Sequence, residues 1–135
     1  MVPKLVDAFL EWAKPRADVV GVALVGSHAR GSATAGSDID LLLVTTDPAA
    51  YVSHTRWTRE LGAVGSISTE EWGAVTSVRV SYVDGPEVEF GVTSPAWTTV
   101  DPVDPGTARV VRGGFRILFD PTGSLELLAE AVNRS

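Results

Sequence analysis

The chain has 135 residues, of which 44% are hydrophobic, so it is long and apolar enough to fill one compact core. It has no cysteine, which excludes disulfide scaffolds, zinc–thiolate sites and cysteine nucleophiles. Its formal net charge of −6 argues against broad, sequence-independent binding to nucleic acid, because such binding needs a basic surface. The sequence contains neither a signal-peptide pattern nor an apolar run of about 18 residues, so we expect a cytoplasmic protein without a membrane span.

The hydrophobic pattern predicts helices and strands mixed along one domain, residues 1–135. The predicted elements, in chain order, are a helix at 3–14, strands at 18–25 and 38–46, a helix at 48–61, strands at 75–83 and 86–93, a helix at 107–112, a strand at 115–119 and a helix at 124–133. The first helix has apolar residues at intervals of four, and Asp84-Gly85 is a strong turn signal between the third and fourth strands. We therefore expect an α+β fold with a mixed five-stranded sheet flanked by helices.

Small residues dominate the segment 26–37, directly after the first predicted strand. Glycine at position 26 would let a phosphate approach the backbone closely. The hydroxyl of Ser27 could donate to a phosphate oxygen, and Arg30 adds a cation three residues later. A short helix after Ser27 would add free N–H groups that favour an anion. The segment thus predicts a triphosphate-binding loop.

Two carboxylates, Asp38 and Asp40, begin the second predicted strand. Side chains at i and i+2 of a strand point to the same face, roughly 6.5–7 Å apart. Their repulsion beside apolar residues is costly unless a cation compensates it. A divalent ion such as Mg²⁺, which prefers oxygen ligands and tolerates phosphate as a further ligand, is the natural counter-ion.

The loop and the carboxylates together form a specific motif. It reads Gly26-Ser27-His28-Ala29-Arg30-Gly31 and, after five residues, Ser37-Asp38-Ile39-Asp40-Leu41. This run resembles the signature of the DNA polymerase β-type nucleotidyltransferase superfamily, in particular its small bacterial branch of minimal and antibiotic nucleotidyltransferases. The resemblance implies a nucleotidyltransferase fold in which Gly26, Ser27, Arg30 and Ser37 bind the nucleotide.

The superfamily also has a third carboxylate on a later strand, for which Glu87 and Glu89 are the candidates. Both lie on one face of the predicted strand, so spacing alone does not choose between them, but Glu89 fits the family pattern better because it has apolar neighbours on both sides. The resemblance implies that Asp38, Asp40 and Glu89 are the catalytic residues and hold two Mg²⁺ ions, with Mn²⁺ as an alternative. They would transfer a nucleoside monophosphate from a nucleoside triphosphate such as ATP to an acceptor hydroxyl, with release of pyrophosphate.

The acceptor is not identified by the sequence and could be a small molecule, a protein or RNA. Its site must come from the segments 62–74 and 94–106, from a second copy in a homodimer, or from a helical partner protein. The tryptophans are expected mostly in the core, although Trp72 or Trp97 could stack on a base. The alternative function is that of an antitoxin-type nucleotidyltransferase module that binds or modifies a HEPN-type toxin.

Overall fold

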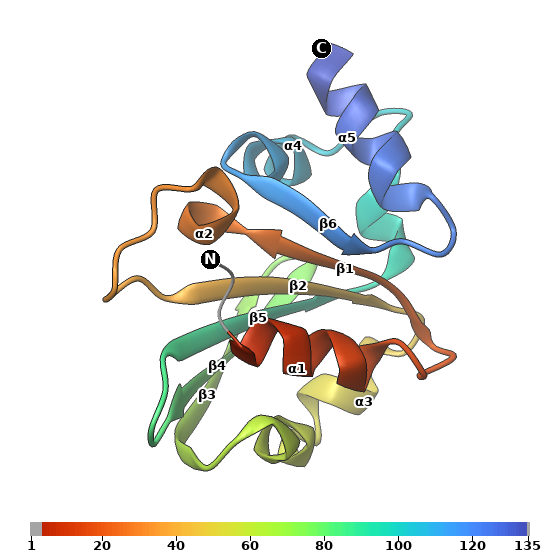
Figure 1. Ribbon diagram of the computed structural model, residues 1–135. Coiled ribbons are helices and arrows are strands. Elements are labelled where there is room, and N and C mark those ends of the chain that lie inside the picture. The colour runs from red at the N-terminus through yellow and green to blue at the C-terminus, as the bar shows by residue number, and fades with distance from the viewer. Residues whose placement is uncertain (1–3, 135) are drawn as a thin grey trace.

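The computed structural model describes residues 4–134, and this part of the chain forms one six-stranded mixed sheet with helices on both faces (Figure 1). The strands are β1 Val19–Val25, β2 Ile39–Thr45, β3 Val64–Trp72, β4 Val75–Tyr82, β5 Glu87–Thr93 and β6 Phe115–Phe119. The helices are α1 Lys4–Ala13, α2 Gly26–Arg30, α3 Pro48–Val52, α4 Pro105–Arg112 and α5 Ser124–Arg134, with 3-10 turns η1 Arg56–Leu61 and η2 Pro95–Thr98. The α+β prediction is confirmed, but the expected count of five strands is wrong because residues 64–72 form β3.

The order of the strands across the sheet is β3-β4-β5-β2-β1-β6. The central strands β2 and β5 run parallel, whereas the other neighbours are antiparallel. In this register Asp40 of β2 lies opposite Glu89 of β5, and Glu89 lies opposite Arg79 of β4. The pairing of the sheet therefore brings charged residues from three separate segments to one place.

Each face of the sheet has its own core, as expected for strands that are buried on both sides. Phe9 of α1 and Trp57 of η1 pack on Phe90 of β5, with ring centroids 5.1 and 5.0 Å from it. On the other face, α4 and α5 cover Leu42 of β2. Asp40 precedes Leu42 by two residues, so it lies on the face that α4 and α5 cover.

The single helix predicted at 48–61 is wrong, because α3 ends at Val52 and the separate turn η1 follows. The indole Nε1 of Trp57 donates to the carbonyl oxygen of Tyr51 at 2.9 Å, in place of the backbone N–H that a continuous helix would offer. Both side chains are thereby buried in the core under α1. The predicted first helix is confirmed as α1, although its expected start at Pro3 lies outside the described residues.

The strand β3 forms an exposed edge of the sheet, paired with β4 alone. Its last residue, Trp72, is 61% exposed, so this tryptophan, one of the two expected as possible exceptions, lies outside the core. No helix within residues 4–134 has the length and apolar character needed to cross a membrane.

Candidate functional site

The first strand ends in a tight turn that lies directly against Asp40. Val25, the last residue of β1, is the register partner of Asp40, and Gly26 follows with φ +71°. A Cβ atom at Gly26 would lie 2.6 Å from Oδ2 of Asp40. The turn therefore requires glycine for its positive φ and for its close approach to the carboxylate.

The four residues predicted to bind the nucleotide differ in what they contact. The hydroxyl of Ser27 makes no hydrogen bond within residues 4–134 and stands next to the Gly26 turn. Arg30 instead donates from Nη1 to the carbonyl oxygen of Gly113 at 2.6 Å, which ties α2 to the end of α4. The Ser37 hydroxyl accepts from the backbone N–H of Thr34 at 2.9 Å, within its own loop. Of the side chains of these four residues, only the hydroxyl of Ser27 has no hydrogen bond in the described structure, whereas those of Arg30 and Ser37 are already held by contacts within the protein.

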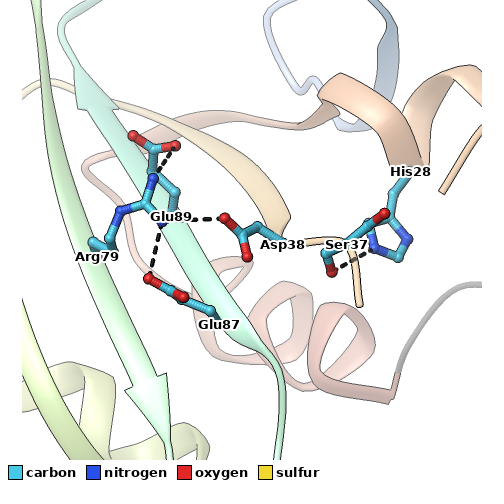
Figure 2. A network of polar contacts seen from close by, with 6 residues as sticks. All are labelled: His28, Ser37, Asp38, Arg79, Glu87 and Glu89. Atoms are coloured by element: carbon cyan, nitrogen blue, oxygen red, sulfur yellow. Dashed lines mark hydrogen bonds and ion pairs between the residues drawn. The ribbon is translucent and has the colours of Figure 1, made fainter. Parts of the chain in front are cut away.

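A guanidinium group stands among the acidic residues (Figure 2). Nη1 of Arg79 lies 3.1 Å from Oδ2 of Asp38 and 2.9 Å from Oε1 of Glu87, and Nη2 lies 3.5 Å from Oε2 of Glu89. These contacts hold the pKa of Arg79 above its usual range, the hydrogen bonds to Glu87 and Asp38 being the main cause. The sequence reasoning missed Arg79, since a single arginine on a strand carries no signal of its neighbours.

The fourth carboxylate, Asp40, has no ion pair with a cation among residues 4–134. Its pKa is raised to about 7, mainly by burial and further by the hydrogen bond to the adjacent Glu89 carboxylate and by the charges of Glu89 and Asp38, while the charge of Arg79 acts in the opposite direction. The side chain of Glu89 is 27% exposed, against 39% for Glu87. Of the two candidates for a third carboxylate, Glu89 is therefore the more buried one and the one that contacts Asp40.

The carboxylates as they stand do not form a finished metal site. Among residues 4–134, no three acidic or histidine side chains surround one point closely enough to hold an ion. The reason lies in Arg79, to which the carboxylates of Asp38 and Glu89 are turned. The donor set nevertheless suits a hard divalent cation, because it consists of carboxylate oxygens and leaves like charges on Asp40 and Glu89 in contact.

A glycine–serine turn beside carboxylates on two adjacent strands suits a ligand that carries phosphate groups and a divalent ion. Residues 3–84 match the family model of the nucleotidyltransferase domain, and the chain belongs to this family. Nucleotidyltransferases are enzymes that transfer nucleoside monophosphates. The matched segment includes Gly26, Ser27 and Asp40 but ends before Glu89, so the placement of the third carboxylate depends on geometry alone.

The fold is similar to that of a solved structure, an aminoglycoside 6-adenyltransferase from Bacillus subtilis, with a TM-score of 0.56 and 16% sequence identity. The similarity covers 72% of this chain and 37% of that protein, so the chain spans little more than a third of that enzyme's length. No match to the chain was found among curated proteins.

Proposed function

We propose that the protein transfers a nucleoside monophosphate from a nucleoside triphosphate to a hydroxyl group, with Mg²⁺ as its cofactor and pyrophosphate as the second product. The observation that carries this proposal is the pairing of Asp40 with Glu89 beside the Gly26 turn. It brings carboxylates on two adjacent strands next to a backbone that a phosphate can approach. Such a reaction requires Mg²⁺ and nucleoside triphosphates, both of which are abundant in the cytoplasm.

The chain's own residues have separate roles in this reaction. Ser27 donates its free hydroxyl to an oxygen of the β- or γ-phosphate, and the Gly26 turn sets the distance between the triphosphate and Asp40. The acceptor oxygen attacks the α-phosphorus, the bond from that phosphorus to the bridging oxygen breaks, and pyrophosphate leaves with the electron pair. Glu89, on the far side of Asp40 from the turn, accepts the proton of the acceptor hydroxyl.

Asp38 and Asp40 would hold the Mg²⁺ ion that accompanies the triphosphate, and Glu89 would join them at a second ion; Mn²⁺ has the same ligand preference. When bound, the ions supply positive charge to the phosphate oxygens and to the acceptor hydroxyl. Asp38 is now paired with Arg79 at 3.1 Å, so ion binding competes with the guanidinium for this carboxylate. We infer that Arg79 acts as the counter-ion of the metal-free site.

Arg79→Met should destabilise the metal-free protein by about 1 kcal/mol at neutral pH, because partly exposed ion pairs contribute at most about that much. The increase in melting temperature caused by Mg²⁺ and a triphosphate should be larger in this variant than in the wild type, since the ion no longer competes with a guanidinium. Thermal denaturation with and without Mg²⁺ measures both effects. Arg116→Met, which removes an exposed arginine of β6, serves as the control. An equal metal response in both variants would contradict the role of Arg79.

Ser27→Ala should weaken the binding of a non-hydrolysable triphosphate about tenfold or more, as expected for a hydrogen bond to a charged group. The melting temperature should stay close to that of wild type because the hydroxyl has no partner in the described structure. Arg30→Ala should also weaken binding, but it should lower the melting temperature too, since it breaks the 2.6 Å bond to Gly113. Calorimetric titration gives the affinities, with Ser66→Ala on the exposed β3 as the control.

The reaction itself is tested with each of the four triphosphates labelled on the α-phosphate, together with Mg²⁺, the protein and a cell extract. We expect one labelled acceptor and an equal amount of pyrophosphate. Label recovered on a small helical protein would favour the antitoxin-type alternative, in which the acceptor is a HEPN-type toxin. Triphosphate that remains intact under all conditions would overturn the proposed transfer.

A further inference from the structure

An open cleft of about 400 Å³ begins at the candidate catalytic carboxylates and extends along the sheet. Asp40 and Glu89 line one end of it, and its floor continues over Gly91 of β5 and Ser77 of β4. Its volume is within the roughly 300–1,000 Å³ that is usual for small-molecule sites. The cleft is thus large enough for a second substrate next to the reacting groups.

Two chain segments form the walls of this cleft. Trp72, at the end of β3, stands on one side, and residues of η2 and α4, among them Trp97, Thr107 and Val110, stand on the other. These residues come from, or adjoin, the segments 62–74 and 94–106, which the sequence left as candidates for the acceptor site. The domain therefore supplies the walls of a binding site from its own chain.

The cleft differs sharply in charge from a phosphate site. Its titratable lining residues are Asp40, Glu89 and Asp104, and none of the lining residues in the described chain is lysine, arginine or histidine. In the metal-free protein an anionic ligand would meet only like charges there, whereas a neutral or cationic ligand would not. The triphosphate belongs at the Gly26 turn, and the cleft suits a different molecule.

The cleft also offers apolar surface that the fold leaves uncovered. Trp72 is 61% exposed, and no other ring within residues 4–134 stacks on it, whereas Trp97 is 6% exposed. Val75 and Val110 add aliphatic surface that is partly open to solvent. A flat indole beside aliphatic side chains favours a ligand with a ring or an apolar body.

The geometry of in-line transfer indicates which substrate the cleft would bind. In-line transfer places the attacking oxygen and the leaving pyrophosphate on opposite sides of the α-phosphorus. The Gly26 turn follows β1, on one side of Asp40, and Val25 of β1 lines that edge of the cleft, while Glu89, Gly91 and Ser77 line the part of the cleft on the other side, over β5 and β4. With the leaving group at the turn, the acceptor approaches from the part of the cleft over β5 and β4.

We propose that this cleft binds the acceptor, and that the acceptor is a small neutral or cationic alcohol with an apolar or aromatic body. This inference rests on the proposed nucleotidyl transfer. The acceptor's oxygen forms the new bond to the α-phosphorus, its proton passes to Glu89, and pyrophosphate leaves, so that no further reactant is needed.

Three probes of one scaffold test the charge and the location of this site: benzyl alcohol, its 4-aminomethyl derivative and its 4-carboxylate. Titrations are followed by NMR through the indole N–H signal of Trp72, which Trp72→Phe identifies. We expect the neutral and cationic probes to shift this signal with dissociation constants at least tenfold lower than that of the anionic probe. Equal affinity for all three, or shifts that leave out Trp72, would overturn the proposal.

Two substitutions at exposed positions provide a matched pair. Val110→Arg adds a cation to the wall of the cleft and should reverse the preference, with the anionic probe gaining about tenfold over the cationic one. Leu127→Arg adds the same charge on α5, outside the cleft, and should leave the order of the probes unchanged. An unreversed preference in Val110→Arg would contradict the assigned cleft.

The labelling experiment with cell extract distinguishes a failure of this inference from a failure of the proposed function. We expect the label in the fraction that passes a filter of small pore size, and a loss of about tenfold in labelling with Trp72→Ala while triphosphate affinity is retained. Label that stays with protein or RNA, accompanied by pyrophosphate, would overturn the small-molecule acceptor but not the transfer. Absence of triphosphate binding and of pyrophosphate would overturn the transfer, and the acceptor site with it.

Discussion

Asp40→Asn should leave the metal-free protein at least as stable as wild type at neutral pH and yet abolish its response to metal. The folded state raises the pKa of Asp40 from 3.8 to about 7, which means that ionising this carboxyl costs folding free energy. The stability that the protonated carboxyl contributes is present below its ordinary pKa and is lost as the pH rises to about 7. Asparagine carries no charge and avoids this loss.

The same substitution removes a ligand that the proposed ions share. Mg²⁺ and a triphosphate at about 100 times their dissociation constant would stabilise the wild type by about 2.7 kcal/mol through mass action. In Asp40→Asn we expect the metal-dependent part of this gain to vanish and transfer to fall on the order of 10³-fold or more. Thermal denaturation from pH 5 to 8, with and without Mg²⁺, separates the two effects.

Asp7→Asn, at an exposed position of α1, controls for the change of one net charge. It should leave both the pH profile and the metal response unchanged. A full metal response in Asp40→Asn would exclude Asp40 as a ligand. A metal-free variant less stable than wild type at pH 8 would mean instead that the carboxylate stabilises the fold.

The proximity of the Gly26-Ser27 turn to the carboxylates that begin β2 could be predicted because the two segments are close in the sequence. Gly26 and Ser27 follow an apolar strand, and Asp38 and Asp40 begin the next, so the motif alone fixes their proximity. Arg79 could not be predicted in this way. Its contacts depend on the register between β4 and β5, which sets it opposite Glu89 and is determined by the whole sheet.

The missed strand β3 has a similar explanation. Its residues from 65 to 72 are exposed, so no alternation of apolar and polar side chains marks it as a strand. It forms because its backbone pairs with β4 along nearly its whole length. The predicted hairpin at 75–93 was confirmed, by contrast, because the apolar residues of β4 and β5 alternate and Asp84-Gly85 joins them.

The two glutamates of β5 differ in their burial and in their contacts, which the sequence alone did not reveal. Glu89 contacts Asp40 and lines the cleft, whereas Glu87 lies nearer the turn and has Arg79, at 2.9 Å, as its ion-pair partner. These positions predict different roles. In the proposed reaction Glu89 would be close to the acceptor, whereas Glu87 contacts the guanidinium of Arg79.

Glu89→Gln should therefore bind Mg²⁺ and a triphosphate within a few-fold of wild type but lose on the order of 10²-fold or more in transfer rate. An interaction made with the acceptor, and used mainly in the transition state, affects turnover and spares nucleotide binding. Without metal the variant should also have a lower pKa at Asp40 than the wild type, because it removes the like charge that contacts this carboxyl.

Glu87→Gln is the matched control, since it makes the same chemical change two residues away on the same strand face. It should lose little activity, and its main effect should be the loss of the ion pair between Glu87 and Arg79. Single-turnover rates and triphosphate affinities measured for both variants decide between the roles. A large loss of rate in Glu87→Gln with near-normal turnover in Glu89→Gln would exchange the two assignments. Near-normal turnover in both would mean that transfer needs no third carboxylate, because no other acidic side chain on β5 faces Asp40 in the described structure.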